Sequence, residues 1–91
     1  MRVVTKVVKI EDQEFVLIFD NKDNRDFYAT IPYSELNDDG SMKRELNGFE
    51  MCISDTIDGA IKRRTNKIAI DKFKKEGHSE EELITFIMNL K

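Results

Sequence analysis

Phe15-Val16-Leu17-Ile18-Phe19 decides the fold, because it places five apolar side chains in a row between polar neighbours. A run this short and this apolar is typical of a strand that is covered on both faces. The valine-rich residues 3–10 precede it across a short polar link, and residues 27–31 follow it in alternation and end at Pro32. We therefore predict an antiparallel meander with 15–19 as its central strand.

The chain after Pro32 contains two dipeptides that favour tight turns, Asp39-Gly40 and Asn47-Gly48. Gly, Asn and Asp tolerate the positive φ angles that such turns need. Phe49, Met51 and Ile53 follow the second dipeptide at alternate positions. This alternation predicts a second, shorter β-ribbon, so the sheet is expected to hold three to five strands.

Apolar residues recur at helical spacing after Ser54, which predicts a helix over 54–76. Ser54 or Asp55 is suited to cap its start. Gly77 suits the position just past its end, because a residue without a Cβ adopts the left-handed backbone at least cost. Gly59 and the polar pair Thr65-Asn66 lie inside the pattern and leave open whether the helix is continuous or divided in two.

The last predicted helix begins with a capping box, Ser79-Glu80-Glu81-Glu82, in which Ser and the third Glu satisfy each other's free backbone N–H groups. Its apolar stripe consists of Leu83, Phe86, Ile87 and Leu90, and Ile84 and Met88 widen it. The stripe is broad for a terminal helix. Either the protein's own sheet covers it, or part of it is an interface with a second copy or another protein.

Together these patterns predict one α+β domain, residues 1–91, which is mainly β over 1–53 and mainly helical over 54–91. We expect an N-terminal antiparallel β-meander followed by two C-terminal helices packed on the sheet. Hydrophobic residues make up 40% of the chain and are spread along it, which is typical of a globular protein.

The sequence carries no sign of export or membrane insertion. No apolar run approaches the roughly 18 residues that a membrane span needs, and Arg2 and Lys6 interrupt the N-terminal valines, so we expect neither a signal peptide nor membrane contact. Cys52 is the lone cysteine and excludes an intramolecular disulfide. A reducing, cytoplasmic location is the expectation.

Residue patterns of known catalytic and metal sites are missing from this sequence, so we expect no enzyme activity, catalytic residue, metal, cofactor or small-molecule substrate. His78 lies between Gly77 and Ser79 and is predicted to be an exposed linker residue without a partner. Cys52 is predicted to be a small apolar filler. The acidic run 20–26 resembles a calcium loop only superficially, because a basic residue occupies the position where that loop turns on glycine.

Net positive charge is confined to one segment of an acidic protein. Residues 1–53 carry a net charge of −4, residues 54–78 carry +3, and the whole chain carries −3. The candidate contact residues for a nucleic acid or an acidic partner are Lys62, Arg63, Arg64, Lys67 and Lys74. Three interpretations of this basic helix remain open: its basic face is solvated, it binds phosphates, or it contacts an acidic protein surface. That acidic surface can be the protein's own β half.

From sequence alone, the favoured function is a small cytoplasmic binding or regulatory module that acts through protein–protein contacts, by association with a protein partner or with itself. The alternative is a nucleic-acid-binding accessory protein that uses the basic helix 54–76. No single residue decides between the two.

Overall fold

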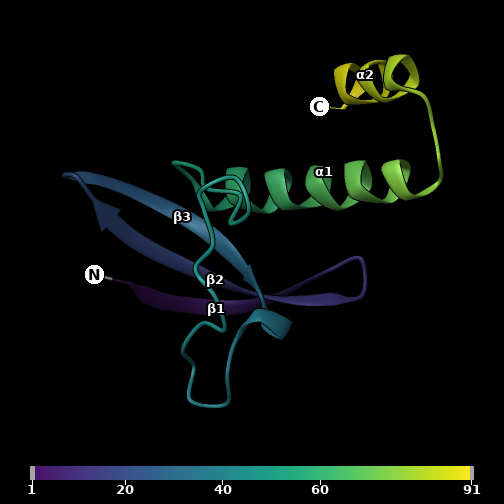
Figure 1. Ribbon diagram of the computed structural model, residues 1–91. Helices are drawn as coiled ribbons and strands as arrows, with labels where there is room; N and C mark the ends of the chain where they lie inside the picture. The colour runs from purple at the N-terminus through teal and green to yellow at the C-terminus, as the bar shows by residue number, and fades with distance from the viewer. Residues whose placement is uncertain (1, 91) are drawn as a thin grey trace.

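The protein forms a three-stranded sheet followed by two helices, and the computed structural model describes residues 2–90 (Figure 1). The elements are strands β1 (Val3–Ile10), β2 (Gln13–Lys22) and β3 (Arg25–Pro32), a 3-10 helix η1 (Tyr33–Glu35), and helices α1 (Ile57–Lys75) and α2 (Glu80–Asn89). The predicted α+β arrangement, with strands first and helices last, is confirmed.

The sheet is the predicted antiparallel meander, with strand order β1-β2-β3. Two-residue turns join its strands, at Glu11-Asp12 and at Asp23-Asn24, and all four residues have φ between 51° and 64°. Left-handed backbone at both central positions characterises the type I′ turn, whose twist matches that of the flanking strands. Asn and Asp tolerate this conformation better than most side chains do.

The central strand is covered on both faces, as its apolar run predicts. On one face, Val16 and Ile18 belong to a core cluster with Leu46 and Met51 from the long connection after β3. Side chains alternate between the faces of a strand, so Phe15 belongs to the opposite face, where Arg64 of α1 lies over its ring. The connection and α1 therefore form the two covering layers.

The predicted second β-ribbon is wrong, because residues 48–52 form consecutive turns. The backbone N–H groups of Met51 and Ile53 donate to the carbonyl oxygens of Asn47 and Gly48 at 3.1 and 3.3 Å. Cys52 has a φ of 55°, which breaks the extended backbone that a strand needs. The segment contacts β3 at two points: the Met51 carbonyl oxygen accepts from the Thr30 N–H at 2.8 Å, and an isolated bridge pairs Ser54 with Tyr28.

Helix α1 is continuous, which answers the question that Gly59 and Thr65-Asn66 leave open in the sequence. Thr56 caps its start, rather than the predicted Ser54 or Asp55, and the Thr56 hydroxyl accepts from the Gly59 N–H at 2.9 Å. A Cβ at Gly59 would overlap Ser54 Oγ and lie 2.8 Å from Thr56 Oγ1. The glycine therefore makes room for the cap instead of breaking the helix.

Helix α2 begins with the predicted capping box between Ser79 and Glu82. Gly77 lies just past the end of α1 with a φ of 82°, as predicted. The packing of the helices differs from the expectation: α1 packs against β3, whereas α2 packs on α1 (Figure 1). Phe86 of α2 stacks on Phe73 of α1 with 4.2 Å between ring centroids. Both helices were expected to lie on the sheet, and only α1 clearly does.

Candidate functional site

A groove of about 410 Å³ lies between α1 and the turns of residues 48–53. The turns contribute Phe49 and Ile53, and α1 contributes Arg63, Lys67, Ile70 and Lys74. The groove thus combines three large apolar side chains with three cations.

The turn that carries Phe49 is fixed by reciprocal hydrogen bonds between Asn47 and Glu50. The Asn47 side-chain oxygen accepts from the Glu50 N–H at 2.8 Å, and the Glu50 carboxylate accepts from the Asn47 N–H at 3.2 Å. The other Glu50 oxygen lies 2.9 Å from Arg44. The hydrogen bond from the Asn47 backbone, followed by that from Arg44, lowers the pKa of Glu50. This turn holds Phe49 outward with 79% of its surface exposed.

The three cations of the groove differ in what they contact. Lys67 Nζ lies 5.5 Å from the centre of the Phe49 ring and 3.0 Å from an Asp71 oxygen, so its charge is already engaged. Arg63 and Lys74 are exposed. Within the described residues 2–90, neither has an ion-pair partner. They are the two cations that remain available to a ligand.

Arg64, one of the five basic candidates, is separate from the groove because its side chain is only 5% exposed. Its guanidinium donates to the Thr30 hydroxyl at 2.7 Å, to the Thr30 carbonyl oxygen at 2.8 Å and to the Glu50 carbonyl oxygen at 2.7 Å. It also lies 4.8 Å from the Phe15 ring centre, and burial lowers its pKa. Lys62 is exposed but does not line the groove.

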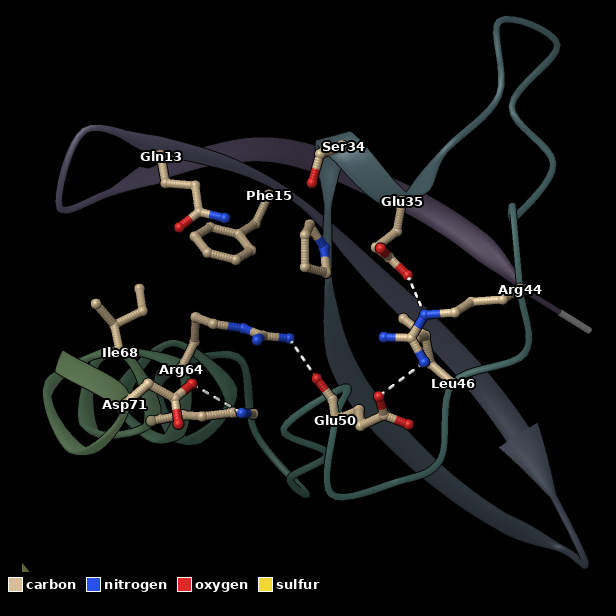
Figure 2. Close-up of a pocket in the computed structure, with 12 residues that line it drawn as sticks. Gln13, Phe15, Ser34, Glu35, Arg44, Leu46, Glu50, Arg64, Ile68 and Asp71 are labelled. Carbon is tan, nitrogen blue, oxygen red and sulfur yellow. Dashed lines mark hydrogen bonds and ion pairs between the residues drawn. The ribbon is translucent and has the colours of Figure 1, made fainter. Parts of the chain in front are cut away.

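A second pocket, of about 250 Å³, lies beside Arg64 near η1 (Figure 2). Its charged side chains contact one another: Arg44 lies 2.8 Å from Glu35 and 2.9 Å from Glu50, and Lys67 pairs with Asp71. Each of these charged groups already has a partner within the protein, so the second pocket is a weaker candidate for a ligand than the groove.

The predicted interface on α2 is only partly on the surface. Leu83, Phe86 and Leu90 are half-buried, whereas Ile87 is exposed. Ile84 and Met88, which widen the predicted stripe, are 58% and 78% exposed. The apolar face that α2 presents to solvent therefore consists of Ile84, Ile87 and Met88.

His78 has contacts that its position between two helices does not reveal. Its ring stacks on Phe73 with 3.7 Å between centroids, and it lies 3.6 Å from a Glu76 oxygen and 3.8 Å from a Glu82 oxygen. Cys52 is buried, and burial raises the pKa of its thiol. Within residues 2–90, no three His, Cys, Asp or Glu side chains gather in a way that would hold a metal ion. In the same range, no helix is long and apolar enough to cross a bilayer.

Comparison with known proteins gives no relative from which to transfer a function. No protein-family model, curated protein or solved structure matches this chain. The groove and the outward face of α2 therefore have to be interpreted from their own chemistry.

Proposed function

We propose that this protein is a small binding module whose groove takes an acidic protein segment that carries large apolar side chains. The observation that carries the proposal is the combination in one groove of an outward phenylalanine with two exposed cations, Arg63 and Lys74, that lack ion-pair partners among the described residues.

The apolar part of the groove supports a partner with apolar side chains. Phe49 is 79% exposed and Ile53 is 37% exposed, and both lie beside Ile70 on the groove wall. Aromatic residues that a partner desolvates contribute a large share of the binding energy at protein interfaces. The Asn47–Glu50 hydrogen bonds hold this aromatic in place before binding, which reduces the entropy lost on association.

The cations support acidic groups in that partner. Arg63 and Lys74 lie eleven residues apart on α1, and Lys67 lies between them. Carboxylates facing these cations would steer the partner to the groove and fix its orientation. Arg63 supplies a planar fork that can bind a carboxylate with two hydrogen bonds.

A nucleic acid is the weaker candidate for the same groove. Phe49 could stack on a base, and the flanking cations could contact phosphates. However, the chain has a net charge of −3, and its β half alone carries −4. A polyanion that extends beyond the groove would meet this acidic surface, whereas a short acidic peptide would not.

The proposal is tested by fluorescence anisotropy with three labelled probes. These are a peptide of Glu, Leu and Phe about ten residues long, the same peptide with Lys in place of Glu, and a single-stranded oligothymidylate. We expect the acidic peptide alone to bind, and to bind about tenfold more weakly to Arg63→Glu or to Phe49→Ala.

Lys62→Glu is the matched control, because Lys62 is an exposed cation of the same helix outside the groove. It should change the affinity by less than about twofold. Failure of the acidic peptide to bind would overturn the proposal, as would equal losses from Lys62→Glu and Arg63→Glu. Oligothymidylate binding that Phe49→Ala abolishes would replace it with nucleic-acid binding.

A further inference from the structure

The surface of α2 that faces away from α1 has the chemistry that the groove would recognise. Ile84, Ile87 and Met88 are 58%, 43% and 78% exposed. Glu80 precedes them by four, seven and eight residues, which places it on the same helix face. Glu81 is also exposed and lies beside this face.

The two acids at the start of this face are not engaged elsewhere. Glu82 belongs to the capping box with Ser79. By contrast, Glu80 and Glu81 have no ion-pair partner among residues 2–90. Ten residues of α2 carry three acids and no base. The outward face of α2 therefore begins with two acids in the first turn and continues with apolar residues towards the C-terminal end of the helix.

The groove and this face also match in length. Ten helical residues at 1.5 Å each make α2 about 15 Å long, and the eleven steps from Arg63 to Lys74 span about 16 Å. Apolar residues of the face would meet Phe49, Ile53 and Ile70. Glu80 and Glu81 both lie in the first turn of α2, so they would face one of the two exposed cations, at one end of the groove.

The protein's own α2 is not free to fill its own groove. It is held on α1 through the opposite side of the helix, where Phe86 stacks on Phe73. At about 100° per residue, Phe86 lies about 100° or more around the helix from each of Ile84, Ile87 and Met88. The outward face is thus presented to another molecule while the inward face keeps α2 docked.

We infer that the groove of one copy takes the outward face of α2 from a second copy, and that two such contacts close a symmetric dimer. This inference rests on the proposed function, because it names the acidic, apolar segment as part of this same chain. Self-association then occupies the groove, so a foreign acidic segment has to compete with the second copy for it.

The inference is tested by measuring the mass of the full chain by light scattering and sedimentation over a range of concentrations. We expect the mass to rise from the 10.7 kDa monomer towards twice that value. The double variants Arg63→Glu/Lys74→Glu and Glu80→Lys/Glu81→Lys should each stay monomeric, because like charges then face each other. Each variant is checked by circular dichroism for an unchanged fold.

Mixing the two variants is the decisive step. The reversed groove of one then faces the reversed helix of the other, and the two unreversed surfaces also meet. We expect the mixture to regain the dimer mass, and a chain with all four substitutions to regain it alone. No structural damage caused by the substitutions separately would be repaired by mixing.

The outcomes separate this inference from the function on which it rests. A wild-type chain that stays monomeric at every concentration and yet binds the acidic peptide overturns the inference and leaves the proposed function standing. A dimer that survives both double variants overturns the inference as well. A monomer that also fails to bind the acidic peptide overturns both.

Discussion

At the scale of single residues, Arg64 shows that two neighbouring residues of the same type can lie in different environments. It follows Arg63 directly and belongs to the same basic run, yet Arg63 is exposed and Arg64 is buried under the turn that carries Glu50. Its three hydrogen bonds join β3, the turn and α1 through one side chain. Arg64 therefore connects the sheet to the groove that is built beside it.

We predict that Arg64→Met lowers the free energy of unfolding by about 2–5 kcal/mol. The substitution keeps a long apolar stem but leaves the carbonyl oxygens of Thr30 and Glu50 without their buried donor. Urea denaturation followed by circular dichroism measures the effect. Arg63→Met is the matched control and should change stability by no more than about 0.5 kcal/mol. Equal effects of the two substitutions would contradict the role assigned to Arg64.

Sequence alone could not have separated the two arginines. Helical periodicity places Arg64 four residues after Ala60, which is fully buried. That spacing is the one signal available, and the charge of an arginine ordinarily outweighs it because such residues are rarely buried without partners. The partners here are backbone carbonyls contributed by positions 30 and 50, which no local pattern identifies.

At the scale of elements, the two hairpins, the start of α2 and the end of α1 follow from local chemistry, and the sequence predicts them, whereas α1 is capped by Thr56 instead of the predicted Ser54 or Asp55. Two-residue turns, a capping box and Gly77 each depend on residues within a few positions of one another. The segment 47–53 behaves differently. Its alternation of apolar residues imitates a strand, but Asn47 and Glu50 close a turn by bonding to each other's backbone.

The turn at 47–50 should be acid-sensitive because of Glu50. Its pKa is lowered in the folded protein, so its carboxylate contributes stability above the ordinary pKa of a glutamate, and that contribution is lost as the pH falls through the lowered value. We predict that wild type is more stable than Glu50→Gln at about pH 6 and that the difference shrinks towards about pH 3.

Urea midpoints of the two proteins at each pH measure this difference. Glu45→Gln is the control, at an exposed carboxylate outside the turn. If the gap between wild type and Glu50→Gln stays constant from about pH 6 to about pH 3, then ionised Glu50 does not stabilise the turn.

At the scale of the whole molecule, the division between an acidic β half and a basic helix does not produce ion pairs between them. Within residues 2–90, no Lys or Arg of α1 pairs with an acid of the sheet or of the long connection. Lys67 pairs within α1, and Arg25 of β3 lies 4.0 Å from Asp55 just before it. Apolar packing and the hydrogen bonds of Arg64 join the halves instead.

Salt should therefore have little effect on folding and a large effect on binding. We predict that raising NaCl from about 0.05 M to about 1 M changes the free energy of unfolding by less than about 1 kcal/mol, since exposed pairs contribute little. The same change should weaken binding of the acidic peptide markedly, because its contacts with Arg63 and Lys74 are screened. Urea unfolding and anisotropy on the same samples measure the two effects, and a large salt-dependent loss of stability would contradict this division.

The contact between Arg64 and Thr30 also has a consequence for the order of folding. The two hairpins bring together residues that are close in sequence, which is the fastest kind of contact to form. Arg64 and Thr30 are 34 residues apart, so their meeting requires a much longer loop to close. We expect α1 to dock on a sheet that is already paired, so that weakening Arg64 would speed unfolding more than it would slow refolding. The residue that joins the two halves would then set how long the folded protein survives, while the two hairpin turns set how quickly it is made.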